Sequence, residues 1–126
     1  MIHVGDVFAW ERTFTEEDVR LFGRLSGDEG VHHMIPDEQG RLMVQGLLTA
    51  TLPTKVGGDL NYIARELVFE FLRPVYVGDT IRCAVTITQL EQAEGHTRMA
   101  ATWTCQNQSG KEVLIGHTYG VIRNAN

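Results

Sequence analysis

Long apolar runs are missing from this chain of 126 residues. None of its apolar runs approaches the roughly 20 residues that a helix needs to cross a bilayer. The N-terminal residues, Met1 to Asp6, also lack the charged-then-apolar layout of a secretory signal peptide. We therefore expect a cytoplasmic protein that does not span a membrane.

Cysteine is scarce, and the common metal-binding motifs are absent. Cys83 and Cys105 are the only cysteines, and both occupy apolar positions of strand-like segments. Such positions favour small buried thiols over a disulfide or a pair of metal ligands. The sequence has no CxxC or HExxH motif, and His32 and His33 have no acidic or thiol partners at ligand spacing. We expect neither a metal nor another cofactor.

Runs of basic residues are also missing. Eleven Lys and Arg stand against sixteen Asp and Glu, which gives a formal charge of −5, and no basic stripe could neutralise phosphates. We therefore do not expect nucleic acid as a partner. With 43% apolar and 21% charged residues, the composition is that of a globular protein, and the length fits one domain over residues 1–126.

Two helices are predicted. Thr15 and Asp18 have the spacing of a capping box, apolar residues then recur at helical intervals, and Ser26-Gly27 ends the first helix. The second helix is predicted from Leu42 to Val56, where charge is nearly absent, so it should be buried. Pro53 should kink its last turn because proline cannot donate to the carbonyl of Thr49.

From Tyr62 onward the apolar period changes from 3.6 to 2. Alternation over 67–71, 81–87, 99–105 and 113–121, with short turns between, predicts four antiparallel strands. An N-terminal strand at 7–13 would add a fifth. The sequence thus predicts an α+β fold in which a single antiparallel sheet wraps around one long central helix.

A carboxylate and an imidazole lie close together in the sequence just after the first helix. Asp28 follows the Gly27 stop, and His33 comes five residues later. Loops on a rigid scaffold often carry catalytic groups, so this pair suggests acid/base chemistry. The alternative for Asp28 is an Asx-turn residue without chemistry.

These residues resemble the MaoC-like hydratases, which include the (R)-specific enoyl-CoA hydratases and share the hot-dog fold. The resemblance spans nearly the whole chain. It rests on Gly5-Asp6, Thr13-Phe14-Thr15, Leu25-Ser26-Gly27-Asp28 with His33, Gly46-Leu47-Leu48, and 67–79, which reads LVFEFLRPVYVGD.

The resemblance implies reversible hydration of 2-enoyl thioesters of CoA or acyl-carrier protein. By it, Asp28 and His33 hold the water, the amide of Gly46 stabilises the enolate oxygen, and Thr54 supports Asp28. His33 is preferred over His32 because only His33 keeps the family spacing. Gln45 and His32 are candidates for binding the substrate, and a homodimer or larger homo-oligomer is expected.

The chain departs from the family pattern at two points. Asp28-Glu29-Gly30-Val31-His32-His33 lacks the usual Asn-Pro, and Gln45 replaces the usual histidine before Gly46. The segment between them is shorter than usual, so the preferred acyl length is not inherited. Two other functions therefore stay open: a hot-dog acyl-CoA thioesterase, and a module that binds acyl thioesters without turnover.

Overall fold

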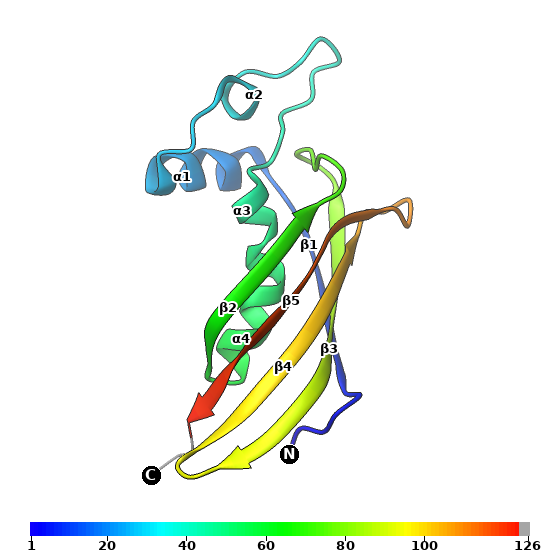
Figure 1. The fold of residues 1–126 in the computed structure, drawn as a ribbon. Helices are drawn as coiled ribbons and strands as arrows, with labels where there is room; N and C mark the ends of the chain where they lie inside the picture. Colours follow the sequence, from blue (N-terminus) through cyan, green and yellow to red (C-terminus); the bar gives the residue numbers. More distant parts are fainter. Residues whose placement is uncertain (124–126) are drawn as a thin grey trace.

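The computed structural model describes residues 1–123. A curved sheet surrounds a central helical segment, and two further helices lie beyond one end of it (Figure 1). The strands are β1 (Val7–Thr13), β2 (Tyr62–Phe71), β3 (Thr80–Ala93), β4 (His96–Gln106) and β5 (Glu112–Arg123). The helices are α1 (Glu16–Ser26), α2 (Val31–Met34), α3 (Gly46–Thr49) and α4 (Thr51–Asp59).

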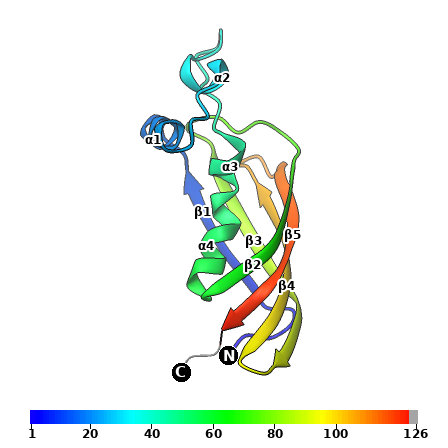
Figure 2. The same ribbon diagram turned by 60° about the vertical axis from the view of Figure 1, so that its left-hand side comes forward.

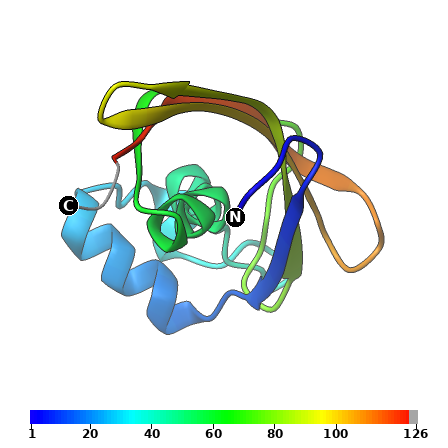
Figure 3. The same ribbon diagram turned by 90° about the horizontal axis from the view of Figure 1, so that it is seen from below.

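The sheet has the strand order β1-β3-β4-β5-β2, and every neighbouring pair is antiparallel. The five-stranded antiparallel sheet expected from the period-2 pattern is therefore confirmed. Seen along the helix in Figure 3, the sheet curves around α3 and α4. Strand β2 lies at one edge, so one of its sides is open to pairing.

Helix α1 begins and ends where the sequence predicts. The Thr15 hydroxyl accepts a hydrogen bond from the Asp18 amide, and the Asp18 carboxylate accepts one from the Thr15 amide. Gly27 ends the helix in the left-handed conformation, at φ 79°, which favours glycine. The chain can therefore turn sharply and present Asp28 directly after the helix.

The central helix differs from the prediction of one long helix from Leu42 to Val56. It begins at Gly46 and is divided at Ala50 into α3 and α4. Pro53 accounts for the division, because it has no N–H for the carbonyl of Thr49 four residues earlier. The residues from Leu42 to Val44 are extended and pair with Val75 and Val77 through backbone hydrogen bonds.

The core lies between the concave face of the sheet and the helices. Cys83 and Cys105 face each other across β3 and β4, are fully buried and form no disulfide. The prediction of buried thiols is confirmed. Among residues 1–123, no helix combines the length and the apolar character needed to cross a membrane.

Candidate active site

The structure brings Asp28 and His33 together. His33 lies on α2, a short helix that the sequence did not predict, and its side chain is buried. A carboxylate oxygen of Asp28, Oδ2, lies 3.8 Å from His33 Nε2, and about half of the Asp28 side chain is exposed. This separation is too long for a direct hydrogen bond. It is short enough for one water molecule to reach both atoms.

A backbone carbonyl fixes the proton on the His33 ring. Nδ1 of His33 lies 2.8 Å from the carbonyl oxygen of Met43. Because a carbonyl only accepts, Nδ1 must carry the proton, and the neutral ring then has its lone pair on Nε2. Two hydrogen-bond acceptors, His33 Nε2 and Asp28 Oδ2, therefore face the same small space.

Gln45 ties this loop to the central helix. Its amide nitrogen donates to the carbonyls of Val19, at 2.9 Å, and Asp28, at 3.3 Å. The side chain is fully buried, and its Oε1 has no hydrogen-bond partner among the described residues. These contacts join the backbone at Asp28 to the residue before α3. The substrate-binding role expected for Gln45 stays a prediction.

The N-terminus of α3 opens into a cleft beside His33. We call it the His33 cleft; its volume is about 360 Å³, and its lining includes His33, Gly46, Thr49 and Phe71. Helix geometry leaves the Gly46 amide without an acceptor inside the helix. A Cβ on Gly46 would lie 2.8 Å from Cε1 of Phe71, so a side chain here would require Phe71 to move.

Thr49 is a site residue that sequence reasoning missed. Its hydroxyl is buried, has no hydrogen-bond partner among residues 1–123, and belongs to the lining of the His33 cleft. It follows Gly46 by three residues on the same helical turn, a spacing that places both on one face. This spacing was the available signal in the sequence.

The other two predicted residues differ in position. His32 lines the His33 cleft, where its ring lies 4.0 Å from the His33 ring, centroid to centroid. Thr54 instead donates to the carbonyl of Thr51 and lines a separate pocket farther along the helix. No hydrogen bond joins Thr54 to Asp28 within the described chain, so the predicted support of Asp28 by Thr54 is not observed.

The site therefore gathers at one end of the molecule. Figure 2 shows α1 and α2 beyond the N-terminal end of α3, which is where the loop carrying Asp28 meets the helix. The His33 imidazole and the helix-terminal Gly46 line the cleft there, and the Asp28 carboxylate lies 3.8 Å from the imidazole. Such a set can bind water, accept its proton and stabilise a developing oxyanion. In residues 1–123 no cluster of three or more His, Cys, Asp or Glu side chains could hold a metal ion.

The chain is similar in sequence to a known dehydratase and a known hydratase. A mitochondrial 3-hydroxyacyl-[acyl-carrier-protein] dehydratase of Arabidopsis thaliana is 24% identical over 134 residues, which cover 98% of this chain and 80% of that protein. An (R)-specific enoyl-CoA hydratase of Rhodospirillum rubrum is 28% identical over 126 residues, which cover 91% and 84% of the two chains.

Solved structures show the same fold. The (R)-hydratase of A. caviae involved in PHA biosynthesis superposes with a TM-score of 0.85 at 25% identity, covering 98% of both chains. A MaoC-like dehydratase from Rhodospirillum rubrum gives a TM-score of 0.78 at 15% identity, covering 99% and 95%. The hot-dog architecture and the resemblance to MaoC-like hydratases are thereby confirmed. Residues 33–115 match the family model described as FAS1-like, dehydratase domain region, and the protein therefore belongs to that family.

Proposed function

We propose that this protein is a lyase that adds water to 2-enoyl thioesters and removes it from 3-hydroxyacyl thioesters. The relatives carry these activities in their names, one on an acyl-carrier protein and one on CoA. The observation that supports the proposal best is the pair of acceptors, His33 Nε2 and Asp28 Oδ2, which lie 3.8 Å apart, with His33 in the lining of the His33 cleft. A water molecule there can donate one hydrogen to each.

The two acceptors orient the water for attack. With both hydrogens donated, a lone pair of the water oxygen is free to attack the β-carbon of the enoyl group. His33 Nε2 takes one proton as the C–O bond forms, and the negative charge of Asp28 stabilises the resulting imidazolium. The imidazolium then gives a proton to the α-carbon. The water oxygen with one hydrogen thus ends on the β-carbon, and the other hydrogen ends on the α-carbon.

The electron pair of the double bond needs a place to go during the attack. It moves to the thioester oxygen, which becomes an enolate. The Gly46 amide, which lines the cleft at the start of α3, donates to that oxygen in this proposal. Dehydration follows the same steps in reverse.

We also propose a homodimer formed through the edge strand β2. Apolar side chains on or just after this strand are exposed, among them Ile63, Leu67, Phe71 and Leu72. An open edge with this much apolar surface is a site for pairing with a second copy. The cytoplasmic location stays a prediction.

The experiment that tests the proposed activity follows two signals in parallel. Purified protein is incubated with crotonyl-CoA and with oct-2-enoyl-CoA, and loss of enoyl absorbance is recorded together with release of thiol. We expect a loss of enoyl absorbance without release of thiol. Thiol release would assign a thioesterase, in which the water attacks the thioester carbonyl, and binding without either signal would assign a non-catalytic module.

Variants assign the chemistry to residues. Asp28→Asn and His33→Gln should each lower kcat/KM by about 10²- to 10⁴-fold, the usual contribution of acid/base groups. Glu29→Gln and His117→Gln are matched controls, since Glu29 belongs to the same loop and His117 is exposed on β5. Equal losses in the variants and their controls would contradict the assignment of Asp28 and His33.

A further inference from the structure

Three buried polar side-chain atoms have no hydrogen-bond partner within residues 1–123: Oε1 of Gln45, Oγ1 of Thr49 and Nε1 of Trp103. A buried polar group without a partner costs stability, so each of these atoms needs an explanation. Of the three residues, Thr49 alone belongs to the lining of the His33 cleft, together with Gly46. Its hydroxyl is therefore the group that a molecule bound in the cleft can satisfy.

The two other threonines of the central helix have paired hydroxyls. Thr51 donates to the carbonyl of Leu48 at 2.6 Å, and Thr54 donates to the carbonyl of Thr51 at 2.9 Å. A helical threonine can also donate to the carbonyl four residues earlier. For Thr49 that carbonyl belongs to Gln45, and it already accepts from the amides of Leu48 and Thr49. Because both lone pairs of this oxygen are used, the Thr49 proton is left for an acceptor outside the helix.

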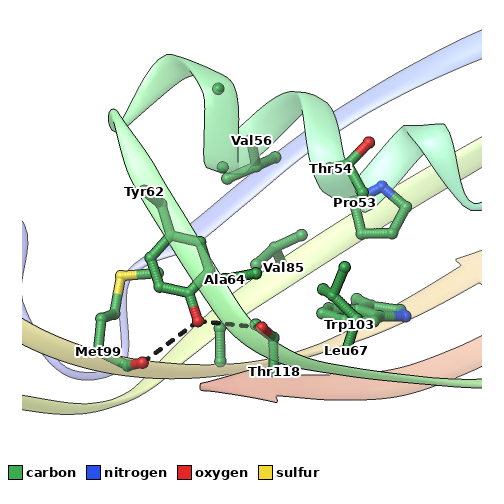
Figure 4. A pocket seen from close by; sticks show the side chains of 13 residues that line it. Pro53, Thr54, Val56, Tyr62, Ala64, Leu67, Val85, Met99, Trp103 and Thr118 are labelled. Atoms are coloured by element: carbon green, nitrogen blue, oxygen red, sulfur yellow. Dashed lines mark hydrogen bonds between the residues drawn. The ribbon is translucent and has the colours of Figure 1, made fainter. Parts of the chain in front are cut away.

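The hydroxyls in the pocket farther along the helix are also paired (Figure 4). The Tyr62 hydroxyl lies 2.9 Å from the Thr118 hydroxyl, which donates to the carbonyl of Glu66 at 2.6 Å. Thr54 lines the same pocket, and its hydroxyl is used within the helix. The hydroxyl groups of that pocket thus have partners inside the protein, whereas the hydroxyl of Thr49 at the cleft has none among the described residues.

The Thr49 hydroxyl and the Gly46 amide can reach the same atom. The two residues are three positions apart on α3, so they lie on one face of the helix. Cβ positions with this spacing are about 5–6 Å apart, and helical side chains lean toward the N-terminus, which here is Gly46. An oxyanion lies about 2.7–3.1 Å from each of its donors. One oxygen between the two groups can therefore accept a hydrogen bond from both.

From this geometry we propose that the Thr49 hydroxyl is a second donor to the thioester oxygen, beside the amide of Gly46. As water attacks the β-carbon, the electron pair of the double bond moves to this oxygen, and the negative charge strengthens both hydrogen bonds. Thr49 then stabilises the enolate more than the bound substrate, which raises kcat. The inference rests on the proposed function, which supplies the thioester oxygen. It makes Thr49 a catalytic residue whose hydroxyl is paired only while substrate is bound.

A side chain of the cleft must move before the thioester reaches this hydroxyl, because Thr49 is only 3% exposed. Phe71 is placed to do so. It lines the cleft with Thr49, its ring lies against Gly46, and it is 53% exposed at the end of the edge strand β2. In this proposal the Phe71 ring turns outward when substrate enters, and the two donors become accessible.

Three variants test the hydroxyl. Thr49→Val keeps the branching of the side chain and removes only the hydroxyl, Thr49→Ser retains the hydroxyl, and Thr51→Val removes the paired hydroxyl of the same helix. We expect Thr49→Val to lower kcat for hydration of crotonyl-CoA by about 10²- to 10³-fold, the usual loss for one oxyanion donor, with little change in KM. Thr49→Ser should keep most of the wild-type kcat, and Thr51→Val should keep all of it.

Urea denaturation of the same variants separates a catalytic hydroxyl from a structural one. Removal of a buried hydroxyl without a partner costs no hydrogen bond, so Thr49→Val should unfold at the same urea concentration as wild type or a higher one. Thr51→Val loses a hydrogen bond and should unfold at a lower concentration. If an internal water molecule pairs the Thr49 hydroxyl, Thr49→Val is destabilised as well. A lower urea midpoint in Thr49→Val with an unchanged kcat would therefore overturn the proposal.

Acetoacetyl-CoA separates this inference from the proposed function, because its binding needs no turnover. Its enolate carries a negative charge on the thioester oxygen and absorbs in the ultraviolet. We expect wild type and Thr49→Ser to increase the enolate fraction of the bound ligand, and Thr49→Val to lower the enolate-to-keto ratio by about tenfold, the effect of one hydrogen bond to a charged oxygen. This loss supports the role of Thr49 even if enoyl-CoAs are not hydrated. Equal enolate fractions in wild type and Thr49→Val, or hydration at the same rate, overturn that role and leave the lyase intact.

Discussion

Replacing Gln45 by glutamate should make the stability of the protein depend on pH. The amide nitrogen of Gln45 donates to the carbonyls of Val19 and Asp28 in a fully buried position. A carboxyl group in the same place can donate only when it is protonated, and then to only one of the two carbonyls. Once ionised, it would face two carbonyl oxygens without a donor. Folding therefore favours the protonated form and raises the pKa of the new group above its usual value of about 4.3.

The magnitude follows from linkage. A raised folded-state pKa means that the folded protein holds its proton while the unfolded chain releases it above about pH 4.3. Stability therefore falls by about 1.4 kcal/mol per pH unit above that value, until the folded-state pKa is reached. If the group is still protonated in the folded protein at pH 7, titration of the unfolded chain lowers the free energy of unfolding by about 3.7 kcal/mol. The lost hydrogen bond adds about 1 kcal/mol at every pH.

Urea denaturation of the wild type and Gln45→Glu, from pH 4.5 to 7.5, measures this difference. Gln45→Met is the control, because it keeps an unbranched side chain at this position and cannot titrate, so its deficit should not change with pH. If the loss of unfolding free energy in Gln45→Glu does not change with pH, the predicted rise in pKa is wrong. The carboxylate would then reach solvent, and Gln45 would not be held as the structure shows. Steady-state kinetics of Gln45→Met add a second reading. A fall in kcat would indicate that Gln45 positions Asp28, whereas a rise in KM alone would indicate that Gln45 binds the substrate directly.

Four further outcomes are expected. Thr15→Ala should lower the free energy of unfolding by about 1 kcal/mol by removing the cap of α1, measured by urea denaturation with Thr15→Ser as the control; no change would contradict the capping geometry. Burial opposes ionisation of Asp18, but hydrogen bonds from Thr15 and the charge of Arg12 hold its pKa below 3.8. Ionised Asp18 therefore stabilises the fold above pH 3.8, and this contribution is lost as the pH falls below that value. The difference in the free energy of unfolding between wild type and Asp18→Asn should shrink at low pH. The hydrogen bond with Cys83 and burial raise the pKa of Cys105, so both thiols should resist alkylation until urea unfolds the protein, and rapid labelling of the native state would contradict the fold. Light scattering should give the mass of a dimer, and Ile63→Glu should shift it toward the monomer.

Local patterns in the sequence predicted a large part of the fold. The capping box at Thr15 and Asp18 set the start of α1, and period-2 alternation located the strands, because both depend on residues close in sequence. The start of the central helix was not predictable in the same way. Leu42 to Val44 are as apolar as the helix that follows, and only their backbone pairing with Val75 and Val77, about thirty residues away, makes them extended.

The candidate site was also only partly predictable from the sequence. The spacing of Asp28 and His33 was readable, and the structure places the two side chains 3.8 Å apart. The hydrogen bonds of Gln45 were not readable, because one of them goes to the carbonyl of Val19 on a different helix. Thr49 was missed although its spacing from Gly46 is readable, because a buried hydroxyl looks like an ordinary core residue until the cleft beside it is known.

The sheet order also has a consequence for how the protein folds. Strand β2 pairs only with β5, the last strand along the described chain, and β5 must also join β4. Contacts between segments so far apart in sequence form late, because long loops must close first. On the ribosome, a chain still lacking β5 holds α4 and β2 without the partner that joins them to the sheet, so their apolar surfaces stay exposed. The strand that supplies Thr118 is thus also the one that completes the hydrophobic core.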